Sequence, residues 1–287
     1  MAPLQHKAHP VSVVRDLLAE TLRERYALER EVARGGMATL YLARELSSNQ
    51  LVAIKVMHPA VVNAVGIERF LREIEIATSL SHPLIVPLYH SGNAGGVLYY
   101  VMPYVEGESL YQRLERERQL PLEAALRITH DVAEALGYAH SRGFLHRDIK
   151  PENILLAGGR ALVADFGLAR AIGAADHEKL TETGIMVGTV FYMSPEQLRG
   201  QRDLDQRADI YSLGCILYEM LTGEPPYAGR VINQVVTRIV REPIPSARRL
   251  RPEVPPGVDQ AISKALAKAA ADRFASMADF AAALPRP

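Results

Sequence analysis

The sequence lacks the features that define several large classes of protein. It has one cysteine, Cys215, among 287 residues, which excludes an intramolecular disulfide framework and favours a reducing, cytosolic setting. Lys plus Arg and Asp plus Glu number 33 each, so the net charge is zero and the basic excess typical of nucleic-acid binding is missing. No apolar run reaches about 18 residues, so we expect no membrane span, and no signal-peptide core opens the chain.

The residues that are present indicate a sizeable core and two kinds of secondary structure. Hydrophobic residues make up 48% of the chain. Alternating patterns predict strands over 26–33, 39–44, 51–57, 85–89 and 97–102, with one helix over 67–80. After residues 103–107 the pattern becomes helical, over 122–140, 205–222, 232–241, 258–269 and 276–283. This segregation is typical of an α+β fold.

A further helical stripe lies over residues 11–25, before the first strand. Two roles stay open for it from sequence alone. It either packs on the strand-rich part or mediates dimerisation.

Two short motifs carry the chemistry. The first is His146-Arg147-Asp148-Ile149-Lys150-Pro151-Glu152-Asn153, and the second is Asp165-Phe166-Gly167. Apolar runs on both sides of Gly158-Gly159 predict a β-hairpin between them, which would bring Asp165 near Asp148 and Asn153. Carboxylate and amide oxygens are ligands that Mg²⁺ prefers, often together with phosphate oxygens, and Asp148 remains to accept a proton. The motifs therefore indicate phosphate-ester chemistry.

With the other motifs of the chain, in their order, these residues resemble the eukaryotic-like (Hanks-type) serine/threonine protein kinases of the bacterial branch. The resemblance covers about residues 26–284. It implies a bilobal protein kinase fold with a small β-rich N-lobe, containing one main helix, over 26–103 and a larger helical C-lobe over 104–284. Residues 1–25 form an N-terminal extension with a helix.

The resemblance assigns a phosphate-covering loop to the first two strands. The expected ATP-contacting residues there are Val32, Ala33, Arg34, Gly35, Gly36, Met37, Ala38, Thr39 and Leu40. Small residues let backbone N–H groups approach phosphate oxygens. The family has glycine at the sites of Ala33, Gly35 and Ala38, and only the middle one matches, so an ordinary hairpin turn remains the alternative interpretation of this segment.

The remaining ATP-binding residues follow from the same resemblance. Lys55, in Ala53-Ile54-Lys55, would hold the α/β-phosphates and pair with Glu73, for which Glu75 is the alternative. Met102 would be the gatekeeper residue. The Pro103 carbonyl and the Val105 N–H would contact adenine, and Ala53 and Leu155 complete the expected ATP-binding set.

The catalytic residues are likewise assigned by resemblance. Asp148 would orient the substrate hydroxyl and accept its proton, while Lys150 neutralises charge on the γ-phosphoryl group, a lysine placement typical of serine/threonine kinases. Asn153 and Asp165 would bind Mg²⁺, with Mn²⁺ as an alternative. We interpret His146 as a packing residue; a metal ligand or general base is the alternative.

The segment from Asp165 to Glu196 corresponds to an activation loop and peptide platform. Glu196 is expected to pair with Arg273, and Asp209 to brace the backbone of the catalytic loop, which is the motif at residues 146–153. Thr189 would help to select serine or threonine. Thr181 and Thr183 are the expected autophosphorylation sites, with Arg147 as a partner for the added phosphate.

The sequence thus predicts an ATP- and Mg²⁺-dependent kinase of protein serine and threonine residues. A homodimer that phosphorylates itself in trans is the expected self-association. We expect a cytoplasmic location, or alternatively the intracellular part of a membrane-anchored receptor kinase. Two other functions stay open: a pseudokinase that binds ATP as a signalling scaffold, and a small-molecule phosphotransferase of related fold.

Overall fold

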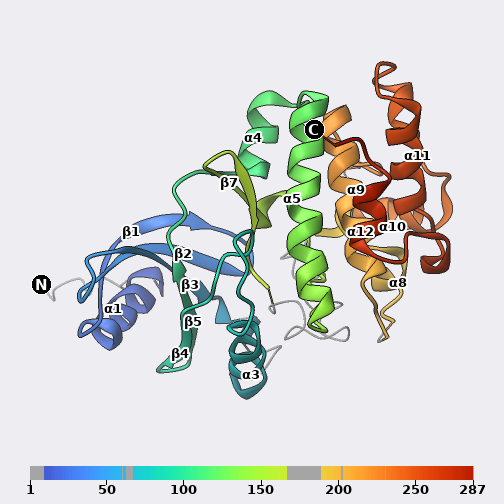
Figure 1. The fold of residues 1–287 in the computed structure, drawn as a ribbon. Helices are drawn as coiled ribbons and strands as arrows, with labels where there is room; N and C mark the ends of the chain where they lie inside the picture. The colour runs from blue at the N-terminus through green and yellow to red at the C-terminus, as the bar shows by residue number, and fades with distance from the viewer. Residues whose placement is uncertain are drawn as a thin grey trace, which may run out of the picture. The chain divides into compact units, whose positions relative to one another are not determined.

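The computed structural model describes residues 10–59, 61–62, 67–166, 189–201, 203–229 and 231–286. Contacts divide the chain into two compact units (Figure 1). Unit 1 comprises Met1–Thr78 and Leu88–Tyr104, and unit 2 comprises Ser79–Pro87 and Val105–Pro287. Strands dominate the described part of unit 1, and helices dominate that of unit 2, as an α+β fold requires.

Unit 1 is built on an antiparallel sheet with the order β1-β2-β3-β5-β4. Its strands are β1 (Tyr26–Arg34), β2 (Ala38–Glu45), β3 (Leu51–Met57), β4 (His90–Ala94) and β5 (Val97–Pro103). Two helices, α1 (Pro10–Leu22) and α3 (Ile67–Ala77), belong to the same unit. Each of these elements except β4 lies close to a segment that the sequence patterns predict.

The prediction of a strand over 85–89 is wrong, because the edge strand β4 begins only at His90. Ile85 makes an isolated parallel bridge to Val163. The Val86 N–H donates to the Val163 carbonyl at 2.9 Å, and the Val163 N–H donates to the Leu84 carbonyl at 2.8 Å. These apolar residues therefore belong to unit 2 and not to the sheet of unit 1. Pro87, which has no N–H to give to a ladder, separates them from β4.

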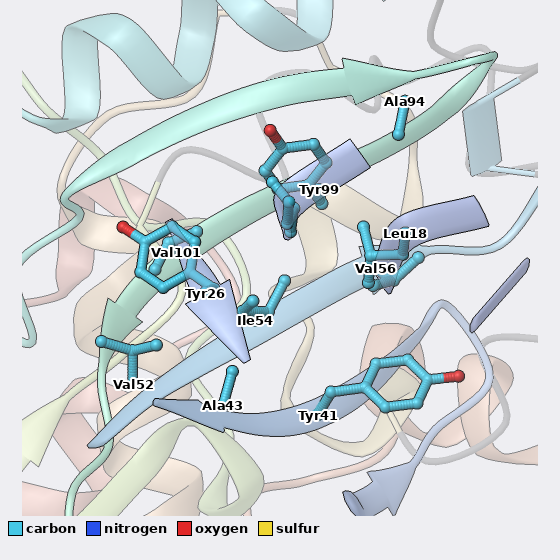
Figure 2. Close-up of a cluster of buried hydrophobic side chains, with 11 residues drawn as sticks. Leu18, Tyr26, Tyr41, Ala43, Val52, Ile54, Val56, Ala94, Tyr99 and Val101 are labelled. Atoms are coloured by element: carbon cyan, nitrogen blue, oxygen red, sulfur yellow. The ribbon is translucent and has the colours of Figure 1, made fainter. Parts of the chain in front are cut away.

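Helix α1 packs on one face of the unit 1 sheet, which agrees with the first of the two roles left open for it. Leu18 and Leu22 are 0% and 6% exposed and lie in one apolar cluster with side chains from all five strands (Figure 2). The strand residues of this cluster are Tyr26, Tyr41, Ala43, Val52, Ile54, Val56, Ala94, Tyr99 and Val101. Burial of each leucine contributes about 2 kcal/mol, so α1 is part of the core of unit 1.

Unit 2 is mainly helical. Its longer helices are α4 (Leu110–Glu117), α5 (Leu122–Ser141), α9 (Arg207–Thr222), α10 (Ile232–Arg241) and α11 (Pro256–Ala265). Shorter ones are α8 (Pro195–Leu198) and α12 (Met277–Ala282), with 3-10 turns η1 (Pro151–Asn153), η2 (Thr189–Tyr192), η3 (Ala247–Arg249) and η4 (Ala270–Asp272). Helix α5 packs against α9 and α12, and α9 is buried along nearly its whole length. No helix in the described part of the chain is long and apolar enough to cross a membrane.

A small three-stranded sheet carries the catalytic-loop region of unit 2. Its strands are β6 (Glu108–Ser109), β7 (Ile154–Ala157) and β8 (Arg160–Val163), in that order. Strands β7 and β8 form the hairpin that the sequence predicts, with Gly158 and Gly159 in its turn at φ of 56° and 78°. Those positive φ values are disfavoured for residues with a side chain, which explains the two glycines.

Gly107 provides a test of how closely β6 and β7 approach. A Cβ added at Gly107 would lie 2.2 Å from the Leu156 carbonyl oxygen, so the main chain would have to shift. We expect Gly107→Ala to lower the free energy of unfolding by about 2 kcal/mol in denaturant titrations. Gly257→Ala in α11 is the matched control, because nothing lies within 4 Å of the added Cβ, and it should be neutral or slightly stabilising. Equal effects of the two substitutions would contradict this account.

Candidate active site

The predicted phosphate loop is the hairpin between β1 and β2 in unit 1. Ala33 pairs with Leu40 and Arg34 with Thr39, so the residues from Val32 to Leu40 lie on the two strand ends and the turn between them. The Gly35 N–H donates to the Ala38 carbonyl at 2.9 Å, which closes the turn over Gly36 and Met37. The segment is thus a hairpin turn, with Gly35 and Gly36 at its tip and Ala33 and Ala38 on the strands.

The other ATP-binding candidates of unit 1 lie on neighbouring strands and on α3. Ala53 on β3 is opposite Met102 on β5, and Pro103 ends that strand opposite Val52. Lys55 is opposite Leu40 on one side and Tyr100 on the other, and it is partly buried. On α3, Glu73 is partly buried whereas Glu75 is exposed, which favours Glu73 as the partner of Lys55; the pairing itself stays a prediction.

In unit 2, the carboxylate of Asp209 organises the catalytic loop. It lies at the start of α9 with 0% exposure and accepts the His146 N–H at 2.9 Å and the Arg147 N–H at 2.8 Å. Its third contact is His140 Nε2 on α5, at 2.7 Å. Burial alone would raise the pKa of Asp209, but the hydrogen bonds from His140 and His146 outweigh it and lower the pKa. The brace expected from the sequence is confirmed, and His140 is a partner that sequence reasoning missed.

His146 is a packing residue, as expected from the sequence. Its side chain is 0% exposed, and its ring meets that of Phe166 edge-on at 4.6 Å between centroids. Nε2 lies 2.9 Å from the Ala164 carbonyl, and Nδ1 accepts the Asp148 N–H at 3.3 Å. This pattern fits a neutral imidazole with its proton on Nε2, since a carbonyl can only accept. Both ring nitrogens therefore fix main-chain positions around Asp148.

Asp148, Lys150 and Asn153 form one connected group. Lys150 Nζ lies 2.9 Å from Asp148 Oδ2 and 3.1 Å from Oδ1. Burial lowers the pKa of Lys150, but the Asp148 carboxylate outweighs this effect and the pKa is raised, so the ammonium stays charged. The Asn153 amide nitrogen donates to the Asp148 carbonyl at 2.8 Å and approaches Oδ2 at 3.3 Å. The amide oxygen of Asn153 is thus the atom left to act as a ligand.

The β7–β8 hairpin brings Asp165 to the same end of the small sheet. Ile154 pairs with Val163, and the Ala164 N–H donates to the Asn153 carbonyl at 2.9 Å. Asp165 follows directly with φ of 67°, and Arg147 has φ of 66°. A left-handed backbone costs a side-chain-bearing residue of order 1–3 kcal/mol, and such strain is concentrated at functional sites. Leu155 lies on β7 opposite Leu162 and Ser109, and Val105 is partly buried upstream of β6.

The segment of unit 2 that follows Thr189 is held by a buried ion pair. The Arg273 guanidinium donates to both oxygens of Glu196, at 2.6 and 2.8 Å, and to the Ala267 and Arg207 carbonyls. The expected Glu196–Arg273 pair is confirmed, and it lowers the pKa of Glu196 although burial opposes this shift. Thr189 begins η2. Thr181 and Thr183 lie outside the described residues.

Sequence reasoning missed three contacts of the segment after Thr189. The Gln197 amide donates to the Arg147 carbonyl at 2.8 Å and so ties the segment to the catalytic loop. The Tyr192 hydroxyl donates to Glu219 at 2.7 Å, and the Ser212 hydroxyl donates to the Tyr192 carbonyl at 2.8 Å. The capping pattern Ser194-Pro195-Glu196-Gln197 was a readable signal for α8, but no local pattern pairs Gln197 with residue 147.

Because of Glu219, which binds Tyr192, the free energy of unfolding depends on pH. Burial raises its pKa from 4.5 to about 7, against the opposing effect of the Tyr192 hydrogen bond. Between these values the folded protein holds a proton that the unfolded chain has lost, so unfolding free energy falls as pH rises through this window. Glu219→Gln stays neutral and keeps an acceptor for Tyr192. We expect it to raise the unfolding free energy by about 1–2 kcal/mol at pH 8 and hardly at pH 5.

Denaturant titrations at both pH values measure this difference. The exposed Glu224→Gln serves as the matched control and should change stability at neither pH. A gain for Glu219→Gln that is the same at pH 5 and pH 8 would rule out its deprotonation as the cause.

Comparison with known proteins places this geometry in a family. Residues 26–282 match the model of the protein kinase domain. The serine/threonine-protein kinase PknB of Mycobacterium leprae is 40% identical over 272 residues, which is 92% of this chain and 43% of the relative. PknB of Mycolicibacterium smegmatis has the same identity and coverage. The serine/threonine-protein kinase PknD of Mycobacterium tuberculosis is 41% identical over 261 residues, covering 90% of this chain and 39% of the relative.

The chain spans less than half the length of these curated relatives, so their full architecture is not represented here. The family match covers both units and every sequence-predicted site residue from Val32 to Thr189. With the braced catalytic loop and the Glu196–Arg273 pair in place, the conclusion is that this chain belongs to the protein kinase family.

Proposed function

We propose that this chain transfers the γ-phosphoryl group of ATP to serine and threonine hydroxyls of protein substrates. The observation that carries the proposal is the group of Asp148, Lys150 and Asn153, held at hydrogen-bonding distances on a loop whose backbone is fixed by Asp209. The relatives named serine/threonine-protein kinase support the class of acceptor. Lys150, two residues after Asp148, is the placement typical of that class.

Asp148 is the group that handles the proton. Its carboxylate would accept a hydrogen bond from the substrate hydroxyl and take the proton as the oxygen bonds to phosphorus. The bond between the γ-phosphorus and the bridging oxygen breaks, and ADP leaves with that electron pair. Lys150 beside the carboxylate would offset negative charge on the transferring group, which is electrostatic stabilisation by a prepositioned cation. Positioning and charge compensation are the protein's main contributions.

The donor atoms of unit 2 fit a divalent cation. Asn153 has its nitrogen engaged by Asp148, so its amide oxygen is the ligand atom, and Asp165 adds a carboxylate. These are hard oxygen donors of the kind that Mg²⁺ shares with phosphate and water, and Mn²⁺ accepts the same set. A bound Mg²⁺ would neutralise phosphate charge.

We propose for this chain the nucleotide contacts that the family resemblance implies. Backbone N–H groups of the loop from Val32 to Leu40 would bind phosphate oxygens, and Lys55 with Glu73 would hold the α- and β-phosphates. Ala53 and Met102 face each other across β3 and β5, which supports a shared role beside the adenine. The Pro103 carbonyl and the Val105 N–H would complete adenine recognition, with Leu155 as a further contact.

The retained catalytic group argues against the pseudokinase alternative, because Lys55, Asp148 and Asp165 are all present. The platform argues against a small-molecule phosphotransferase. Tyr192 is bound to α9, Glu196 to Arg273 and Gln197 to the catalytic loop, so this segment is held beside that loop. Thr189, at the start of this segment, is the proposed selector of the hydroxyl.

A phosphotransfer assay tests the function. The chain is incubated with γ-labelled ATP, Mg²⁺ and a generic basic protein, and label on the protein is counted. We expect transfer by the parent chain, loss of at least about 10³-fold in Asp148→Asn, and no transfer after EDTA until Mg²⁺ is restored. Asp272→Asn, an exposed aspartate in η4, is the matched control and should transfer like the parent. Nucleotide binding without any transfer would instead support the pseudokinase.

Autophosphorylation is the second proposal, at Thr181 and Thr183. Each phosphate adds a charge of about −1.5 to −2 at neutral pH, and Arg147 is a cationic partner on the catalytic loop. We expect mass spectrometry after incubation with ATP to find phosphate at one or both threonines, and Thr181→Ala/Thr183→Ala to have lower activity. The Asp148→Asn chain should remain unmodified. Absence of phosphate at both sites in an active preparation would refute the assignment.

The wider setting is also a proposal. Phosphorylation in trans requires two copies to meet, so we propose a homodimer for the activating step. A cytoplasmic location fits a sequence with one cysteine, which offers no disulfide framework within the chain. The alternative is the intracellular part of a membrane-anchored receptor kinase. The proposed domain extends over 26–284, with residues 1–25 as an extension.

A further inference from the structure

His58, which directly follows β3 in unit 1, is bonded to the phosphate loop at three points. Its N–H donates to the Met37 carbonyl at 2.9 Å. Its ring nitrogen Nδ1 lies 2.9 Å from the Gly36 carbonyl, and Nε2 lies 3.0 Å from the Thr39 hydroxyl. The turn between β1 and β2 is therefore bonded to the residue that follows β3, in addition to the hydrogen bonds between β1 and β2 themselves.

The three contacts are mutually compatible in one protonation state. The Gly36 carbonyl can only accept, so Nδ1 carries the proton. Nε2 of that tautomer is an acceptor, and the Thr39 hydroxyl can donate to it. Thr39 is 4% exposed, which holds this partner in place, and the His58 carbonyl in turn accepts the Val61 N–H at 3.0 Å. His58 is thus fixed from both sides and acts as a rigid link.

The bonds from His58 reach the most flexible part of the loop. The family pattern places glycine at the positions of Ala33 and Ala38, where this chain has side chains. The remaining conformational freedom of the loop backbone lies mainly at Gly35 and Gly36, because glycine is the most adaptable residue type. A loop that is disordered before binding must be ordered by its ligand, and this ordering weakens affinity. Bonds to Gly36 and Met37 restrain that freedom in advance.

We propose that His58 is a positioning residue that preorders the phosphate loop at Gly36, Met37 and Thr39 for the nucleotide. It acts through the loop backbone and does not touch the reacting atoms. The proposal rests on the proposed function for its consequence, which is tighter ATP binding. The restraint itself is a property of the unliganded protein and can be measured without any nucleotide.

The first experiment measures amide hydrogen exchange of residues 35–39 in the chain without nucleotide. His58→Ala removes both ring bonds, and we expect exchange there to accelerate about tenfold, since each net hydrogen bond is worth a few-fold. His58→Asn keeps a side-chain N–H able to reach the Gly36 carbonyl and should recover part of the protection. Asn93→Ala is the matched control, because it removes the Asn93–Gly96 bond of 2.7 Å in the β4–β5 turn and should leave residues 35–39 unchanged.

The second experiment separates binding from chemistry. Preordering acts equally on bound substrate and transition state, so His58→Ala should raise the KM for ATP about five- to tenfold, with a smaller change in kcat. Thr39→Val should raise KM about two- to threefold. Combined with His58→Ala it should add nothing, because both substitutions remove the same bond.

The outcomes distinguish this proposal from the proposed function. Faster exchange at residues 35–39 in a chain that neither binds ATP nor transfers phosphate supports the link but refutes the kinase function. An active kinase whose loop exchange and KM are unchanged by His58→Ala overturns the link. Acceleration spread equally over all strands of unit 1 also overturns it, since that result reports loss of general stability.

Discussion

The buried carboxylate of Asp209 is the constraint on which the catalytic loop depends. It is fully enclosed by protein and accepts hydrogen bonds from two successive main-chain N–H groups and from a histidine ring. An ionised group in such surroundings must have its hydrogen bonds satisfied, because an unpaired buried charge costs several kcal/mol. If the catalytic loop moved away, the Asp209 carboxylate would lose two of its hydrogen bonds, which would be energetically unfavourable. The main chain directly before Asp148 is therefore held by the electrostatic requirement of Asp209 on helix α9.

Hydrogen bonds from side chains to the main chain also hold the rest of the catalytic loop, where they outnumber bonds between side chains. His146 bonds to the Ala164 carbonyl, Asn153 to the Asp148 carbonyl and Gln197 to the Arg147 carbonyl. Main-chain positions are thereby fixed by several independent partners, so the unfavourable φ values at Arg147 and Asp165 persist. Reactive side chains then extend from a backbone with little freedom. This is a physical form of preorganisation.

Sequence reasoning succeeded where the relevant residues are close along the chain or belong to a strong motif. The hairpin between Asn153 and Asp165 and the helix over 232–241 follow from local periodicity and turn residues. The Glu196–Arg273 pair followed from resemblance. By contrast, His140 and His58 carry no local signal, because their partners are defined only by folding. The prediction of a strand at 85–89 was wrong, since a run of apolar residues does not specify the segment with which it forms hydrogen bonds. Helix α4 was also missed, although Ser109 and Gln112 form its capping box.

The packing of α1 separates two boundaries that are often treated as one. The family match starts at residue 26, whereas the apolar core of unit 1 includes Leu18 and Leu22. A 13-residue helix is too short to be stable alone in water, so α1 and the sheet face it covers depend on each other. The apolar core of unit 1 thus extends beyond the residues that the family model matches, and a fragment cut at residue 26 would lose part of that core.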